Sequence, residues 1–426
     1  MRPLDVLIVG AGAAGLATAI FTRRFNPARE VVIVDGAVKP GAKILVSGGS
    51  RCNVTNSLVT ERDFSGGKPA IIRRVLRAFP VPATVEWFAA LGVPLHEEPA
   101  GKLFPDTNSS RDVLNALMRE LADSGTALQP STRVTAIAKH GDFCLETNQG
   151  PIAARRIVLA TGGQSLPKTG SDGAGLQMAR AFGHTIVPTT PALVPLTAGH
   201  GFHAEVAGVA QDVELALWIH GSIARRITGA LLWTHFGISG PAALDMSRHW
   251  LRARLEADEV ALTLSFFPGE TFEAVERRLK QVSEAQPRTS LQNALAQWLP
   301  ASVAHALLHH LAVDTSIALA HFTRNERRRL TRALVEWPLA ISGSRGYNYA
   351  EATAGGVALD EIDPSTMESR RCAGLYLVGE MLDVDGRIGG FNFQWAWASG
   401  RVAARALAKS EIVRGGDRDH GEDRWR

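Results

Sequence analysis

Residues 6–21 read VLIVGAGAAGLATAIF, and residues 31–35 read VVIVD. The first segment joins an apolar run of strand length to a glycine-rich turn and the start of a helix. The second segment is another apolar run, and it ends on an acid. The order strand, GxGxxG, helix, strand, acid predicts a Rossmann unit that binds a dinucleotide.

Each part of this fingerprint has a physical task. Gly10 allows the tight turn, Gly12 lets the backbone approach a pyrophosphate, and Gly15 lets the helix pack close to the strand. The N-terminus of the helix offers unpaired N–H groups and a partial positive charge to the phosphates. Asp35 can accept hydrogen bonds from a ribose. We therefore expect the adenosine half of the dinucleotide here.

Composition sets the outer bounds of the interpretation. The chain has 426 residues, of which 45% are hydrophobic and 21% charged, as in an ordinary globular protein of two or three domains. A net charge of +4 permits an anionic partner without requiring one. Three cysteines without a CxxC pair predict a reducing, cytoplasmic setting. No membrane span and no metal site are expected, and residues 411–426 are predicted to be disordered.

The pattern of apolar residues changes along the chain. Short strand-like runs, among them Val206–Val209, follow a proline-rich boundary near residue 190, and residues 269–332 have helical spacing. Earlier in the chain, Ser110 is expected to cap a helix over Arg111–Asp123. Residues 324–332 carry a dense basic run, which is typical of a solvated helix face or of a phosphate contact.

Residues 41–56 (GAKILVSGGSRCNVTN) end in a stretch rich in Gly, Ser, Asn and Thr, which can approach a ligand closely. Lys43 and Arg51 are two cationic residues on either side of the glycine-rich turn in this stretch. Cys52 is either a packed thiol, which is the commoner case, or a reactive one favoured by the adjacent Arg51.

The last third of the chain returns to nucleotide chemistry. A strand over residues 374–380 ends on Glu380, whose carboxylate can bind a ribose or ribityl hydroxyl. Gly389 and Gly390 then open a helix, whose N-terminus can stabilise an electron-rich ring edge. A reduced flavin needs such a partner and a nicotinamide does not, so this feature favours FAD over NAD as the resident cofactor.

These segments closely resemble a family of FAD-binding oxidoreductases whose members are labelled BaiN-like or aminoacetone-oxidase-like. The matching motifs span nearly the whole chain: GAGAAG (10–15), KILVSGGSRCNVTN (43–56), GKLFP (101–105), ATGGQSLPKTGSDGAG (160–175), PALVPL (191–196), THFGISGPA (234–242), EATAGGVALDEIDPSTMESR (351–370), GLYLVGEMLDVDG (374–386) and GGFNFQWAWASG (389–400). Ser50 replaces a glycine of the family pattern, and residues 269–332 carry few of its motifs.

The resemblance implies an α/β fold with a discontinuous Rossmann-type FAD domain (1–190 and 345–410). It also implies an inserted β-rich, barrel-like domain (191–268 and 333–344) and a helical subdomain (269–332). Together the motifs predict that the following residues contact the cofactor: Gly10, Gly12, Ala13, Ala14, Gly15, Asp35, Lys43, Ser47, Gly48, Arg51, Cys52, Asn53, Val134, Ala160, Thr161, Gly162, Gly379, Glu380, Asp383, Gly389, Gly390, Phe391 and Asn392. Arg51, Asn53 and Cys52 are the candidate catalytic residues.

The predicted function is an FAD-dependent oxidoreductase that takes a hydride from diffusible NAD(P)H and reduces an electron-poor C=C or C=N bond. One alternative, associated with some members of the family, is reduction of a uracil base in ribosomal RNA, with residues 324–332 contacting the RNA. Two others are a flavin-loaded RNA-binding or assembly factor and an NAD-dependent dehydrogenase without flavin. The sequence does not identify the acceptor or the oligomeric state.

Overall fold

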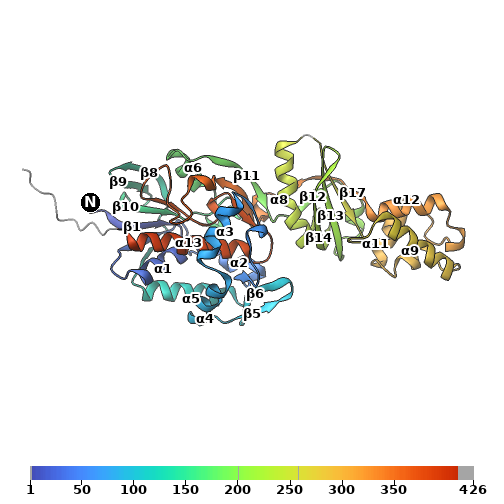
Figure 1. Cartoon of the computed structure of the whole chain (residues 1–426), viewed down its shortest axis with the longest axis horizontal. Helices are drawn as coiled ribbons and strands as arrows, with labels where there is room; N and C mark the ends of the chain where they lie inside the picture. The colour runs from blue at the N-terminus through green and yellow to red at the C-terminus, as the bar shows by residue number, and fades with distance from the viewer. Residues whose placement is uncertain (1, 200, 258, 411–426) are drawn as a thin grey trace, which may run out of the picture.

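The computed structural model describes residues 2–199, 201–257 and 259–410. The molecule is elongated, and its parts follow one another along the long axis (Figure 1). An α/β part lies at one end, an antiparallel sheet in the middle, and helices α9, α11 and α12 at the other end. The expected disorder of residues 411–426 concerns positions outside these ranges.

The α/β part is built on a seven-stranded sheet. In spatial order its strands are β7 (Ala127–Gln129), β2 (Val31–Val34), β1 (Leu4–Val9), β10 (Ile152–Leu159), β9 (Asp142–Thr147) and β8 (Val134–His140), and β20 (Leu375–Leu377) also pairs with β10. β7, β2, β1, β10 and β20 pair in parallel, whereas β9 pairs antiparallel with both β10 and β8. The two apolar runs read from the sequence form strands, as predicted, and these strands are neighbours in the sheet. They are apolar throughout because both faces of a parallel strand are covered.

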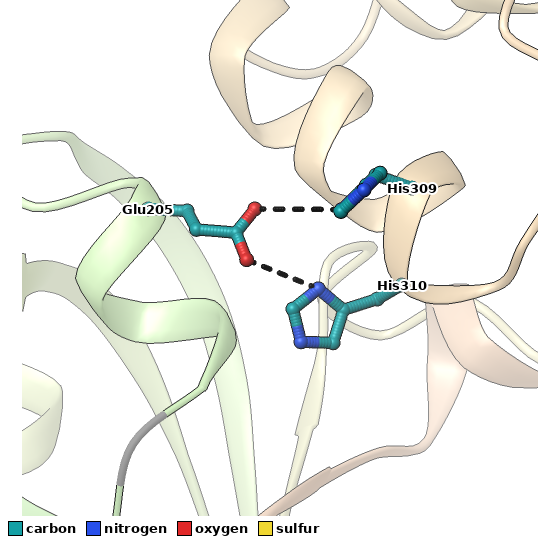
Figure 2. Close-up of side chains that lie close together, drawn as sticks. All are labelled: Glu205, His309 and His310. Carbon is teal, nitrogen blue, oxygen red and sulfur yellow. Dashed lines mark ion pairs between the residues drawn. The ribbon is translucent and has the colours of Figure 1, made fainter.

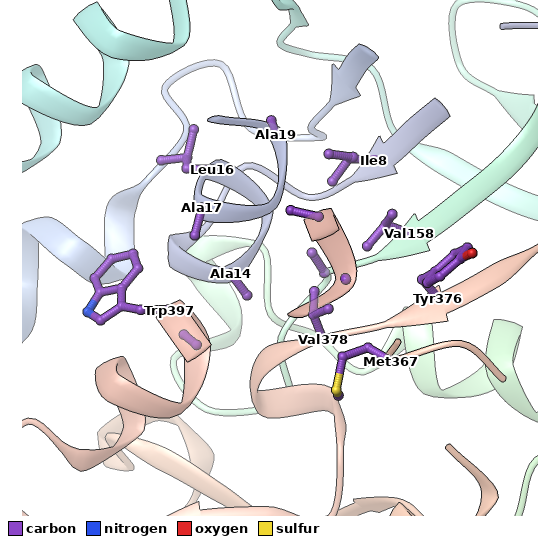
Figure 3. Close-up of a cluster of buried hydrophobic side chains, with 14 of the residues drawn as sticks. Ile8, Ala14, Leu16, Ala17, Ala19, Val158, Met367, Tyr376, Val378 and Trp397 are labelled. Carbon is purple, nitrogen blue, oxygen red and sulfur yellow. The ribbon is translucent and has the colours of Figure 1, made fainter. Parts of the chain in front are cut away.

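Helices α1 (Ala13–Phe25) and α13 (Phe391–Lys409) pack against each other beside this sheet. Gly400 makes the close approach possible, since a Cβ there would lie 2.8 Å from the Ala14 carbonyl oxygen. Figure 3 shows Ala14, Leu16 and Ala17 of α1 in the same buried cluster as Trp397 of α13. The N-terminal and C-terminal segments thus share one core.

The remaining elements of this part surround the sheet. They are α2 (Ala42–Ser50), β3 (Thr55–Asn56), β4 (Phe64–Gly66), α3 (Pro69–Ala78), α4 (Val81–Ala90), β5 (Leu95–Glu98), β6 (Lys102–Pro105), α5 (Ser110–Asp123), α6 (Ala174–Ala181), and β21 (Val384–Gly386). The pair β11 (Ile186–Ala192) and β19 (Ala352–Val357) is antiparallel and flanks the middle part in sequence. None of the described helices is long and apolar enough to cross a membrane.

The middle part is a second seven-stranded sheet, antiparallel throughout. Its order is β17 (Trp337–Leu339), β16 (Val260–Ser265), β13 (Ala210–Ile219), β14 (Ser222–Thr234), β15 (Gly237–Ser239), β12 (Leu196–Ala198) and β18 (Ile341–Ser344). The two edge strands, β17 and β18, are separated in sequence by Ala340 alone. The sheet must therefore curl until these two edges approach each other. Helix α8 (Pro241–Glu256) packs on this sheet.

A second hydrophobic core joins this sheet to the helical part. The helices are α7 (Phe202–Glu205), α9 (Phe272–Ala285), α10 (Leu291–Leu295), α11 (Ala301–His310) and α12 (Arg324–Val335). Thr323 and Glu326 form a capping box at the start of α12, and Thr271 caps α9. The helical spacing of residues 269–332 therefore does form helices.

Two local predictions were wrong. Val206–Val209 is not a strand: Phe202 and Val206 are both buried at helical spacing beside α7, and Val209 N donates to Val206 O in a turn. Ser110 is not the cap of α5, because Ser109 occupies that position. The Ser110 hydroxyl instead donates to the Leu45 carbonyl at 2.8 Å and ties α5 to α2.

A buried polar cluster fastens the C-terminal segment to the region after α6. His184 Nδ1 lies 2.9 Å from Glu361 Oε2, and its Nε2 lies 2.7 Å from Ser369 Oγ. Arg371 and Thr185 donate to the other oxygen of Glu361, each at 2.9 Å. Burial raises the pKa of Glu361, but these hydrogen bonds outweigh it and lower that pKa to about 2.

Candidate functional site

A cavity of about 730 Å³ runs through the α/β part from the glycine turn after β1 to the start of α13. It is lined by most of the residues that the sequence predicts to contact the cofactor: Gly10, Gly12, Ala13, Ala14, Asp35, Lys43, Ser47, Gly48, Arg51, Asn53, Val134, Ala160, Thr161, Gly162, Glu380, Gly389, Gly390 and Asn392. The structure thus brings together residues from both ends of the chain.

The glycine turn has the geometry that an approaching pyrophosphate needs. Gly10 has φ +106°, and a Cβ there would lie 2.5 Å from the Ala160 carbonyl oxygen. A Cβ on Gly12 would meet no atom within 4 Å, so its backbone borders open space. A Cβ on Gly15 would lie 1.9 Å from the Gly10 carbonyl oxygen. Gly12 therefore leaves room for a ligand, and Gly15 is a packing position, as predicted.

Asp35 supports the turn and borders the cavity. Its Oδ2 accepts the Ala11 N–H at 2.7 Å, and its Oδ1 accepts the Ala37 N–H at 2.8 Å. Each carboxylate oxygen keeps a further lone pair for a ribose hydroxyl. Asp35 thus also holds the glycine turn in place, a task that the sequence did not suggest.

The middle of the cavity holds a charged pair formed across 337 residues. Lys43 Nζ lies 2.6 Å from Glu380 Oε2 and 2.7 Å from Ser165 Oγ. Glu380 Oε1 accepts the Ser165 hydroxyl at 2.7 Å and the Thr353 N–H at 2.9 Å. Burial raises the pKa of Glu380, but the Lys43 charge and these hydrogen bonds outweigh it, so the pKa lies below its usual value. Glu380 is therefore an ionised, immobilised carboxylate in the cavity wall.

At the other end, two segments meet that lie far apart in the sequence. Asn56 Nδ2 donates to the Gly389 carbonyl at 3.2 Å, and a Cβ on Gly390 would lie 2.5 Å from the Thr55 carbonyl oxygen. Gly390 is the N-cap residue of α13, in the left-handed conformation. The helix N-terminus thus borders the cavity beside residues 47–56, which is the arrangement expected around a flavin ring.

Asn53 and Arg51 line this end, and they differ in how they are held. Asn53 is buried, and its Oδ1 has no hydrogen-bond partner within the described part of the chain. An orphaned buried carbonyl is costly, so a ligand donor is the expected partner. Arg51 pairs with Glu98 at 2.5 Å and lies over the Phe104 ring, 4.1 Å from its centroid. Arg51 is therefore anchored against the cavity wall.

Five residues predicted to contact the cofactor do not line the cavity: Gly15, Cys52, Gly379, Asp383 and Phe391. Cys52 is fully buried, and burial raises the pKa of its thiol to about 12. A protonated, enclosed thiol is neither a nucleophile nor an exchangeable acid, so the interpretation of Cys52 as reactive or catalytic is corrected. Phe391 is also fully buried, and its ring stacks edge-on against Phe64.

Other residues reach the cavity without having been predicted. Lys102, Phe104, Glu351, Arg387 and Ile388 all line it at the α13 end. Lys102 and Phe104 belong to the GKLFP motif, so the motif was a usable signal. Glu351 begins the motif at residues 351–370, whereas Arg387 lies between two motifs and was marked by none of them. Both reach the cavity because of how β19 and the segment before α13 are folded back.

A separate cluster could hold a metal ion. Glu205 of α7 faces His309 and His310 at the end of α11, with Oε-to-Nδ1 distances of 3.9 and 3.6 Å (Figure 2). It is the single group of three or more metal-ligand side chains in the described ranges, and all three residues are exposed. The cluster lies in the inserted parts and does not border the cavity, so it takes no part in chemistry at the cavity.

The family model described as the HI0933-like protein Rossmann domain matches residues 4–406. The chain belongs to the HI0933-like family. Like the family, it is an FAD-dependent oxidoreductase. This finding argues against the two alternatives of an NAD-dependent dehydrogenase without flavin and of a flavin-loaded RNA-binding or assembly factor. The open backbone at Gly12, the orphaned Asn53 oxygen and the α13 N-terminus fit FAD along the whole cavity.

The chain is also similar to proteins with functional names. A 3-dehydro-bile acid delta(4,6)-reductase from Clostridium scindens is 33% identical over 94% of this chain and 98% of its own length. A ribosomal RNA dihydrouridine synthase from Escherichia coli is 33% identical over 96% of this chain and 98% of its own. Among solved structures, E. coli quinol fumarate reductase FrdA aligns with 96% of this chain and 70% of its own at 14% identity and a TM-score of 0.49.

Proposed function

We propose that the protein reduces an electron-poor C=C or C=N bond of an acceptor, with NAD(P)H as the electron donor. The continuous cavity from the Gly10–Gly15 turn to the α13 N-terminus carries this proposal. Bound FAD would supply hydride transfer at the α13 end. The names of both relatives describe reduction of a ring carbon–carbon double bond, which supports a C=C acceptor for this chain as well.

The chain's own residues at this end would orient the reacting groups. The N–H groups that open α13 would face the ring edge of bound FAD and would stabilise negative charge there. Asn53 offers an unpaired carbonyl oxygen to a ring N–H. Arg51 is held by Glu98 and Phe104 and can therefore polarise an acceptor carbonyl without moving.

A uracil base of ribosomal RNA is a second candidate acceptor. The α13 end of the cavity is lined by three cationic side chains: Arg51, Lys102 and Arg387. Such a lining suits the polyanionic backbone of RNA. This candidate shares the proposed chemistry and differs in the acceptor alone.

The test is anaerobic reduction and reoxidation of the FAD-loaded protein. NADH and NADPH are compared as reductants, and the reduced flavin is then mixed with a uridine-containing ribosomal RNA fragment or with a 3-oxo-dienone steroid. We expect faster reoxidation with one of these acceptors than in buffer, with a two-hydrogen mass gain in the product. Full flavin reduction without reoxidation by either acceptor would refute the proposal.

A pair of variants separates the two ends of the cavity. Arg51→Met should slow acceptor-dependent reoxidation and leave the FAD content unchanged. Arg133 lines the cavity near Asp35 and also pairs with an acid, Asp172, at 2.6 Å. Arg133→Met is the matched control, and it should weaken FAD retention without slowing the acceptor step.

A further inference from the structure

A second pocket of about 260 Å³ adjoins the α13 end of the FAD cavity. Leu193 and Arg387 line both spaces, and Ile388, in the wall of the FAD cavity, donates its N–H at 2.7 Å to Asp245 in the wall of the pocket. The two spaces therefore share part of one wall, and a group bound in this pocket would lie next to the α13 end of the FAD cavity. Its volume is several times that of one water molecule.

The pocket wall is drawn from two parts of the molecule. Arg225 and Arg226 come from β14, and Arg248 from α8, in the inserted β-rich part. Arg387 and Asp385 come from the segment between β20 and α13 in the FAD-binding part. Four arginines from these two parts therefore border one small space.

Two acids of this region, Asp385 and Asp63, are paired with arginines, whereas Asp245 accepts the Ile388 N–H. Asp385 is buried, and Arg248 holds it from Nη2 at 2.8 Å and from Nε at 2.7 Å. Arg387 pairs through Nε with Asp63 at 2.8 Å, which leaves the N–H groups of its Nη atoms for a ligand. Arg226 pairs with Glu214.

Arg225 is the arginine that has no partner. It is exposed, and it makes no hydrogen bond or ion pair within the described ranges, so its five N–H donors remain available. Its charge is felt across the pocket, since it lowers the pKa of both Asp245 and His249. Burial is the larger cause for each group: it raises the pKa of Asp245 to about 6 and lowers that of His249 to about 3. His249 is therefore neutral at pH 7 and adds no charge of its own.

We propose that this pocket is a phosphate-binding subsite beside the flavin ring, with Arg225 and Arg387 as its principal donors. Arginine suits this task because its planar fork matches two phosphate oxygens at once. The proposal rests on the proposed function in one respect: the phosphate comes from a substrate of the reductase. That substrate is the acceptor RNA, through a phosphodiester next to the reduced base, or NADPH, through its 2′-phosphate.

Calorimetric titration of the FAD-loaded protein tests the subsite without turnover. The probes are a short oligouridylate, uridine, NADPH and NADH. Arg225→Ala should weaken binding of the oligouridylate or of NADPH about tenfold or more, as expected for loss of a charge-assisted hydrogen bond to a phosphodiester or to the 2′-phosphate. Arg225→Glu should weaken it further, and binding of uridine and NADH should stay unchanged.

Arg119→Ala is the matched control, because Arg119 is an exposed arginine of α5 that lines neither cavity. A loss confined to the oligouridylate identifies the acceptor phosphodiester, and a loss confined to NADPH identifies the donor phosphate. Unchanged binding of both probes in Arg225→Ala and Arg225→Glu overturns the subsite. Phosphate binding that depends on Arg225 without any acceptor reduction would instead refute the proposed function and leave the subsite standing.

Discussion

Replacing Gly12 by valine should separate cofactor binding from folding. Gly12 has φ −81° and ψ −171°, which valine adopts easily, and a Cβ there meets no protein atom within 4 Å. Because Gly12 is the N-cap of α1, the substitution should cost the fold about 1 kcal/mol or less. The protein without FAD should therefore unfold at nearly the same temperature as the parent.

The loss of FAD affinity should be much larger. Side-chain atoms at this position occupy the open space that the pyrophosphate needs beside the backbone N–H groups. Each hydrogen bond to an ionised group contributes about 1.5–3 kcal/mol, so losing two of them costs about 3–6 kcal/mol. That corresponds to a dissociation constant roughly 10²- to 10⁴-fold higher.

The assay is the flavin-to-protein ratio after purification, followed by titration of FAD into the stripped protein. Gly199→Val is the matched control, since a Cβ on Gly199 also meets nothing within 4 Å and Gly199 does not line the cavity. Gly15→Ala is the contrasting variant, and it should destabilise the fold itself because of the 1.9 Å contact with the Gly10 carbonyl. Normal FAD affinity in Gly12→Val would refute the placement of the pyrophosphate.

Three further predictions concern Cys52, Glu361 and two arginines of α12. In the folded protein, the exposed Cys144 should react with a thiol reagent, whereas the buried Cys52 should not. The Cys52→Ala variant should keep its FAD and its activity. Fast labelling of Cys52 would contradict its burial. Because the pKa of Glu361 is lowered on folding, this carboxylate stabilises the folded protein above pH 4.5, and the stabilisation is lost as the pH falls towards 2. The free energy of unfolding of Glu361→Gln should lack this dependence on pH. An unchanged dependence would argue against the role of the buried polar cluster. Arg327→Ala combined with Arg328→Ala should leave the FAD content unchanged, and a weaker, less salt-dependent binding of ribosomal RNA would show that α12 contacts RNA.

The last of these variants tests a surface far from the cavity. Helix α12 lies at the opposite end of the molecule from the α/β part (Figure 1). Arg328 lies over the Phe272 ring, and Arg329 donates to the Leu311 carbonyl, so part of the basic run has packing tasks within the helical part. An RNA contact through residues 324–332 remains a prediction, and it would require a partner that spans the length of the molecule.

The prediction of the nucleotide half of the candidate site rests on local features of the sequence. The GAGAAG turn, its two flanking strands and Asp35 depend on contacts between chain neighbours or adjacent strands. Backbone sterics decide such positions: Gly10 must have a positive φ, and Gly15 must lack a Cβ. The apolar runs and the helical periodicity of residues 269–332 likewise reflect which faces are buried, so pattern alone indicated those elements.

Tertiary structure decided the rest, because the partners of the other site residues lie hundreds of positions away or have no distinctive local pattern. Lys43 meets Glu380 across 337 residues, and Asn56 meets Gly389 across 333. Cys52 and Arg51 are neighbours in sequence, but they lie in different surroundings. Cys52 has a positive φ and a buried thiol, whereas Arg51 lines the cavity. The second pocket, which Arg225 and Arg387 line, exists because β14 and α8 dock against the segment before α13. Charge and hydrogen bonding act through space, so only the folded chain shows which groups share a site.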